Sequence, residues 1–125
     1  MDYLLDTHVI LWLAGNRKKI RKQTVRLLEN PAHSIWISSV SIWEIGVKSE
    51  LEKLTIPDNW LDQIEDWNAK ELAISWSHAT RASGLPKIHG DPFDRMLIAQ
   101  ALTERMTLVT DDEKIHQYDL KYIEP

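Results

Sequence analysis

Residues 2–15 read "DYLLDTHVILWLAG", and this stretch decides the class of fold. Its first half is a short apolar run that ends at the acid Asp6, which predicts a buried strand over residues 2–6. The segment that follows predicts a short helix over residues 7–15, which ends at a glycine. A strand that leads directly into a helix indicates an α/β protein.

The same alternation continues along the chain. Further strands are predicted over residues 34–38, 71–75 and 106–110, with an edge strand over 120–124. Helices are predicted over residues 17–30, 39–51, 56–70 (with Asp58 as its N-cap), 76–83, 91–105 and 112–118. We therefore expect one α/β domain over residues 1–125 with a mainly parallel sheet. Ligands of such sheets bind beyond the carboxyl ends of the strands, so the residues that follow each strand are the functional candidates.

Composition limits the class of partner and the compartment. The chain has 15 Lys and Arg against 19 Asp and Glu, a formal net charge of −4, so nucleic acid would need a local basic patch or bound cations. The dense basic run "RKKIRK", Arg17–Lys22, is either a solvated helix face or such a patch. The chain has no cysteine, no signal-peptide pattern and no apolar run near the ~20 residues that span a membrane. We expect a cytoplasmic protein.

Acids stand where the predicted sheet would bind a ligand. Asp6 is the first polar residue after the first strand, and the doublet Asp111-Asp112 follows the strand over 106–110. Glu44 lies in the helix after the second strand, and Asp94 lies near the start of the helix before the fourth. Because parallel strands end at the same edge of a sheet, carboxylates from four segments could meet in one cleft.

Each acid also has a purely structural interpretation. Asp6 is a favoured N-cap for the helix at residue 7, and one member of the doublet would cap the helix that follows it. Glu44 precedes Lys48 by four residues, the spacing of a helical ion pair. This helix has little purely polar surface, so we expect Glu44 to be partly buried and to need a partner, either Lys48 or a cation.

The segment "HGDPFDR", residues 89–95, holds two acids with different prospects. Asp91 followed by Pro92 is an N-cap followed by a proline at the first helical position. Asp94 is then the third helical residue, where an acid can complete a capping box. The rest of this helix is apolar almost all round and is predicted to be buried, so Asp94 faces the end of the sheet.

Clustered carboxylates without cysteine suit particular chemistry. Such a donor set favours Mg²⁺ or Mn²⁺ over Zn²⁺, and its natural substrate is a phosphodiester, whose charge the metal neutralises. The chain has no nucleophile elbow, P-loop or dinucleotide-binding motif. All five histidines are interpreted first as surface or packing residues, with His8 and His89 as minor candidates for substrate contact.

Four segments, in order, carry a family resemblance. They are "YLLDTHVILW" (3–12), "SSVSIWEIGVK" (38–48), "DPFDRMLIAQA" (91–101) and "LVTDDEKI" (108–115). Together they resemble the PIN-domain ribonucleases, and most of all the toxins of VapBC-type toxin–antitoxin pairs. The resemblance implies a Rossmann-like three-layer α/β/α fold with a central, mainly parallel sheet. It also implies Mg²⁺- or Mn²⁺-dependent endoribonuclease activity on RNA, a homodimer, and inhibition by a cognate VapB-type antitoxin.

The resemblance assigns roles to individual acids. Asp6, Glu44 and Asp94 match catalytic, metal-binding acids, and Asp112 matches a fourth acid with the same role. Asp111 leaves a one-residue alternative open for that fourth position.

Four further residues are implied as substrate-binding or supporting. Thr7 matches a small polar residue that supports the first acid, and Thr110 matches the polar residue before the fourth. Lys48 and Arg95 are neighbours of the acids that could offset their repulsion or contact phosphate.

Two other function classes fit parts of the sequence. One is a PIN-like module that binds RNA or protein without cutting it. The other is a phosphotransfer protein with Asp6 as nucleophile. The phosphatase pattern wants a second aspartate two positions later, where this chain has His8.

Overall fold

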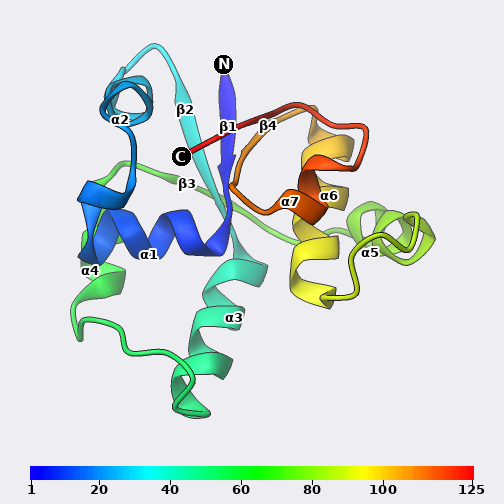
Figure 1. The fold of residues 1–125 in the computed structure, drawn as a ribbon, viewed down its shortest axis with the longest axis horizontal. Coiled ribbons are helices and arrows are strands. Elements are labelled where there is room, and N and C mark those ends of the chain that lie inside the picture. The colour runs from blue at the N-terminus through cyan, green and yellow to red at the C-terminus, as the bar shows by residue number, and fades with distance from the viewer.

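The computed structural model describes residues 1–125 and contains one five-stranded sheet (Figure 1). The strands are β1 (Asp2–Leu5), β2 (Ser34–Ser38), β3 (Lys70–Leu72), β4 (Thr107–Val109) and β5 (Tyr122–Ile123). All neighbouring strands pair in parallel, in the order β3-β2-β1-β4-β5, so β1 lies at the centre. The predicted parallel sheet, with its last strand at an edge, is confirmed.

Helices cover both faces of this sheet. They are α1 (Thr7–Gly15), α2 (Lys22–Glu29), α3 (Ser39–Glu50), α4 (Trp60–Asp66), α5 (Trp76–Gly84), α6 (Pro92–Glu104) and α7 (Glu113–His116), with a 3₁₀ turn, η1 (Arg17–Lys19). Figure 1 shows α1, α2 and α4 to one side of the strands and α5, α6 and α7 to the other. The predicted α/β/α layering is therefore confirmed. No helix combines the length and the apolar character that crossing a membrane requires.

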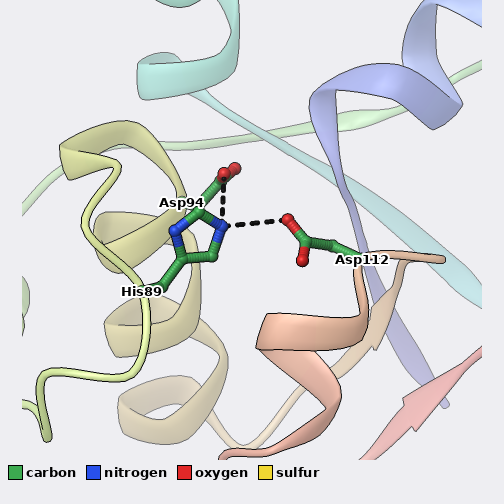
Figure 2. A group of neighbouring side chains, drawn as sticks. All are labelled: His89, Asp94 and Asp112. Atoms are coloured by element: carbon green, nitrogen blue, oxygen red, sulfur yellow. Dashed lines mark hydrogen bonds and ion pairs between the residues drawn. The ribbon is translucent and has the colours of Figure 1, made fainter.

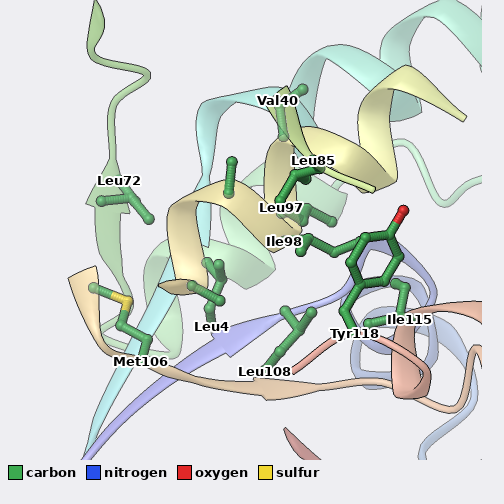
Figure 3. Packing of buried hydrophobic residues seen from close by; sticks show 12 residues of the cluster. Leu4, Val40, Leu72, Leu85, Leu97, Ile98, Met106, Leu108, Ile115 and Tyr118 are labelled. Carbon is green, nitrogen blue, oxygen red and sulfur yellow. The ribbon is translucent and has the colours of Figure 1, made fainter. Parts of the chain in front are cut away.

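Each face of the sheet has its own hydrophobic core. In β1, Leu4 belongs to one cluster, whereas Tyr3 and Leu5 belong to the other. This alternation is what a strand buried on both faces requires. Figure 3 shows the first cluster, where Leu4 and Leu108 of the sheet meet side chains from α6. A continuous apolar run in the sequence thus serves two cores at once.

Strand register brings the functional edge together. Leu5 of β1 pairs with Val109 of β4, and the Asp6 N–H donates to the Val109 carbonyl at 3.0 Å. The next residues, Asp6 and Thr110, therefore leave the sheet side by side.

The helix predicted over residues 17–30 is wrong in its first half. Only a 3₁₀ turn forms over Arg17–Lys19, and α2 begins at Lys22. Between them Ile20 and Arg21 are extended, and Ile20 is buried in the same cluster as α1. Because the helix is interrupted here, the side chain of Ile20 points into the core while the basic residues around it stay exposed.

The predicted bounds of two further elements are also corrected. The helix expected over 56–70 is shorter, because Asn59 rather than Asp58 precedes α4 and Asn68 adopts a positive φ of 56° after it. The strand expected over 71–75 is shifted to Lys70–Leu72. Leu72 pairs with Ser38, the last residue of β2, so there is no neighbouring strand beyond it to pair with.

Replacing a buried leucine of the sheet tests this packing. Leu108→Ala removes a fully buried side chain and should lower the free energy of unfolding by about 2–5 kcal/mol. The matched control, Leu51→Ala, removes the same atoms from a side chain that is 60% exposed and should cost less than about 1 kcal/mol. Urea unfolding followed by circular dichroism measures both. Equal losses would contradict the assigned core.

Candidate active site

Asp6 is the deepest acid at the carboxyl edge of the sheet, with 2% of its surface exposed. Its Oδ1 accepts a hydrogen bond from the Thr7 N–H at 2.6 Å, and its Oδ2 accepts one from the Thr110 hydroxyl at 2.6 Å. Burial raises the pKa of Asp6, helped by the charge of Glu44, and outweighs the opposing effects of the Thr110 hydrogen bond, His8 and the Thr7 N–H. Asp6 is also the N-cap residue of α1, so its structural role and its place in the site coexist.

Glu44 is buried on α3 and already has polar partners. Its Oε1 accepts a hydrogen bond from the Thr7 hydroxyl at 2.6 Å, and its Oε2 pairs with the Lys48 ammonium one turn later. The Thr7 hydroxyl also lies 3.1 Å from the Ser41 hydroxyl. Thr7 therefore joins Glu44 to the backbone that carries Asp6.

Lys48 is a permanent cation that forms a direct ion pair with Glu44. Burial by itself would lower the pKa of Lys48. The hydrogen bond and charge of Glu44, with smaller effects from Asp91 and Asp94, raise that pKa overall. Lys48 thus stays charged and offsets part of the acid–acid repulsion.

The two acids at the start of α6 have different roles. Asp91 is the N-cap, and its Oδ1 accepts hydrogen bonds from the N–H groups of Phe93 at 2.8 Å and Asp94 at 3.4 Å. The Asp94 carboxylate forms no reciprocal capping bond. The predicted helix start is correct, and it leaves the Asp94 side chain available at the edge of the sheet.

The ionisation of Asp94, like that of Asp6, is disfavoured. Burial is the main cause, and the charges of neighbouring acids raise its pKa further, to about 8. Those neighbours are Asp6, Asp91, Glu44 and Asp112. Four segments therefore do contribute carboxylates to one electrostatic environment, as the strand order predicts.

Asp112, rather than Asp111, reaches this environment. The Asp112 N–H donates to the Thr110 hydroxyl at 3.1 Å, and its Oδ1 caps α7 by accepting from the Lys114 N–H at 2.9 Å. Burial would raise the pKa of Asp112, but the hydrogen bond from His89 and further favourable contacts lower it overall. Asp111 is exposed and has no side-chain hydrogen bond.

His89 is a site residue that the sequence suggested only as a minor candidate. Its Nε2 lies 3.0 Å from Asp94 Oδ2 and 2.9 Å from Asp112 Oδ2, as Figure 2 shows. One ligand atom from each of these three residues lies within 4.8 Å of the other two. Its position two residues before the Asp91 cap was the available signal.

Other predicted candidates lie outside the acid cluster. The Arg95 guanidinium donates to four main-chain carbonyls, those of Ala82, Leu85, Pro86 and His89, and pairs with no acid. These contacts let Arg95 anchor the loop before α6, and it does not offset the repulsion of the acids by a direct ion pair. Its contact with substrate phosphate stays a prediction. In the basic run, Arg17 pairs with Glu29 at 3.1 Å.

The donor set fits a hard divalent cation. Carboxylate oxygens are the ligands that Mg²⁺ and Mn²⁺ prefer, and the cluster holds no sulfur donor. The high pKa of Asp94 means that negative charge there is not fully compensated by protein groups. A cation beside Asp94 would supply the missing charge, and such an arrangement can activate water toward a phosphodiester.

Comparison with known proteins identifies the family of this fold. The family model of the PIN domain matches residues 3–121. Ribonuclease VapC22 of Mycobacterium tuberculosis is 29% identical over 119 residues, which cover 92% of this chain and 90% of that protein.

Solved structures share the fold. VapBC2 from Rickettsia felis, bound to a promoter DNA fragment, matches with a TM-score of 0.69 at 19% identity, over 99% of this chain and 98% of the other. VapBC-1 from nontypeable Haemophilus influenzae matches with a TM-score of 0.69 at 23% identity and the same coverage. Because the family model covers nearly all of the sequence and the structures share its layers, the chain belongs to the PIN domain family.

Proposed function

We propose that this chain is a metal-dependent endoribonuclease that hydrolyses RNA phosphodiester bonds, and that it is the toxin of a VapBC-type pair. Its membership of the PIN domain family and its 29% sequence identity to Ribonuclease VapC22 support this proposal. The observation that carries it is the Asp94 carboxyl, buried among other acids with a pKa of about 8. Like charges gathered at one place destabilise a fold, so such a cluster indicates a functional site.

Individual residues have distinct roles in the proposal. Asp6, Glu44 and Asp94 hold one divalent cation, Mg²⁺ or Mn²⁺, and Asp112 holds a second ion or orients the attacking water. When bound, such cations neutralise phosphate charge and favour deprotonation of that water. Lys48, which is partly exposed beside Glu44, contacts the substrate phosphate.

The two threonines act through the acids. The Thr7 hydroxyl donates a hydrogen bond to Glu44 and the Thr110 hydroxyl donates one to Asp6, each at 2.6 Å. They fix the directions of carboxylate lone pairs before any ligand arrives, which reduces the reorganisation that cation binding requires.

Replacing Asp94 tests the proposal most directly. Asp94→Asn keeps the shape of the side chain but removes its charge, and should reduce cleavage of single-stranded RNA at least about 100-fold. Cleavage by the unaltered protein should require Mg²⁺ or Mn²⁺ and stop when EDTA is added. Gel analysis of end-labelled RNA measures both.

Asp111→Asn is the matched control, because it makes the same change in an exposed acid one residue from the cluster. It should leave cleavage within about twofold of the original, as surface substitutions generally have small effects. Undiminished cleavage by folded Asp94→Asn would contradict the assignment of Asp94 as a catalytic metal ligand. Metal-independent RNA binding without cleavage would favour a non-catalytic binding module instead.

The raised pKa of Asp94 predicts a pH dependence of folding without metal. The native protein keeps a proton on Asp94 up to about pH 8, whereas the unfolded chain loses it near the ordinary value of 3.8. The free energy of unfolding should therefore fall as pH rises from about 4 to 8, by at most about 1.4 kcal/mol per pH unit for this proton. Urea unfolding across that range measures the slope.

Asp94→Asn removes this titration and should flatten the slope, although the raised pKa of Asp6 contributes in the same direction. Mn²⁺ competes with the proton, so its stabilising effect should grow over the same pH range. An equal slope in both proteins would contradict the assigned pKa.

We further propose a cognate VapB-type antitoxin and a homodimer. Co-expression with the product of a neighbouring antitoxin gene should give a co-purifying complex and abolish cleavage. Alone, the protein should sediment at about twice the 14.6 kDa mass of one chain. A monomer at micromolar concentration, or full activity in the complex, would contradict the respective proposal.

A further inference from the structure

The main chain of His89 is fixed from two directions. Its N–H donates to the Tyr118 hydroxyl at 2.9 Å, and its carbonyl accepts from Arg95 at 3.2 Å. The Tyr118 hydroxyl donates in turn to the Pro86 carbonyl at 2.7 Å, and the Tyr118 side chain is buried in the core. The loop that carries His89 is therefore held by both α6 and the segment after α7.

The ring of His89 has a defined tautomer. Its Nδ1 lies 3.2 Å from the Asp91 N–H and accepts a hydrogen bond from it. A backbone N–H can only donate, so a proton on Nδ1 would point at another proton. The proton of the neutral ring is therefore on Nε2, the nitrogen that faces the acids.

The Nε2–H has one preferred acceptor. Asp112 Oδ2 at 2.9 Å meets the geometry of a hydrogen bond with it. Asp94 Oδ2 is 3.0 Å from the same nitrogen but does not meet the geometry of a hydrogen bond with it. Figure 2 shows the ring between the two carboxylates.

We propose that His89 positions Asp112 by donating its Nε2–H, and that it is not a ligand of the cation although it lies in the candidate metal cluster. This inference rests on the proposed function. Histidines that bind metals almost always donate their other ring N–H to an acceptor, which fixes the metal-facing nitrogen as unprotonated. In His89 the other nitrogen accepts, and this reverses that arrangement.

Asp112 and Asp94 differ in their hydrogen bonds. Both oxygens of Asp112 accept hydrogen bonds, from His89 and from the Lys114 N–H. The Asp94 carboxylate accepts no hydrogen bond and keeps its lone pairs for a cation. His89 therefore makes Asp112 an oriented acid beside the cation and leaves Asp94 as the direct ligand.

Nitrogen NMR of the protein labelled with ¹⁵N-histidine tests the tautomer directly. His89 is assigned by the loss of its signals in His89→Gln. We expect a protonated Nε2 and an unprotonated Nδ1 without metal, and the same pattern with saturating Mg²⁺. A proton on Nδ1 in either sample would overturn the inference. A ring that binds the cation through Nε2 must carry its proton on Nδ1.

Cation affinity in matched variants tests the role. Calorimetric titration with Mg²⁺ and with Mn²⁺ compares His89→Leu, which has no donor, with His89→Gln, whose amide N–H can replace Nε2–H. Loss of a residue that orients the groups around a metal weakens binding about 10–100-fold. We expect that loss in His89→Leu, by the same factor for both ions, and recovery to within about threefold in His89→Gln.

A lost imidazole ligand would behave differently, because imidazole favours transition metals over Mg²⁺. Weakening confined to Mn²⁺, or equal losses in the glutamine and leucine variants, would contradict the positioning role. His33→Gln is the control for substitution at a histidine, since His33 lies before β2 at the opposite edge of the sheet. Circular dichroism at the titration temperature confirms that each variant is folded.

The outcomes separate this inference from the function on which it rests. If the unaltered protein binds neither ion, or if Asp94→Asn binds them equally well, the proposed metal site is wrong and the role of His89 fails with it. Normal cation binding that depends on Asp94, together with a proton on Nδ1 of His89, overturns the inference alone.

Discussion

The Asp6 carboxylate is buried where the central strand ends, and burying a charge without partners is expensive. Its two partners are the N–H of the first helical residue and the Thr110 hydroxyl beyond β4, each at 2.6 Å. One belongs to α1, which follows β1 in the chain, and the other follows β4, the neighbouring strand. The acid is therefore accommodated only when α1 and β4 are both in register with the central strand, and the rest of the edge is built on that arrangement.

The other acids of the site, except Asp94, also have polar partners. Glu44 has Thr7 and Lys48, and Asp112 has His89 and the first turn of α7. Asp94 accepts no hydrogen bond, and its Oδ2 only lies 3.0 Å from His89 Nε2. The cost of gathering four carboxylates appears in two side chains. The pKa of Asp6 is raised, mainly by burial, and the pKa of Asp94 is raised to about 8. A site that tolerates one uncompensated acid without ligand is prepared to bind a cation.

Predictions from sequence succeeded where the cause was local. The strand predicted over 2–6 forms over Asp2–Leu5, and the helix over 7–15 and the Asp91-Pro92 start of α6 form as predicted. All three follow from periodicity and capping, which act within a few residues. They failed where burial elsewhere decided the result. Ile20 breaks the expected helix because its side chain joins a core built by α1 and β1. The last strand before α5 ends early because its neighbour β2 has ended.

The sequence by itself determined the alternation of strands and helices, and with it the edge at which the acids gather, because both depend on patterns of neighbouring residues. Only the tertiary structure placed Asp112 rather than Asp111 beside His89, brought His89 to Asp94, and directed Arg95 to main-chain carbonyls. Each of these outcomes depends on contacts between groups far apart in the chain, such as Asp112 with His89. Spacing in sequence carries no information about such distances, which are set by how α6, α7 and the loop before α6 pack against one another.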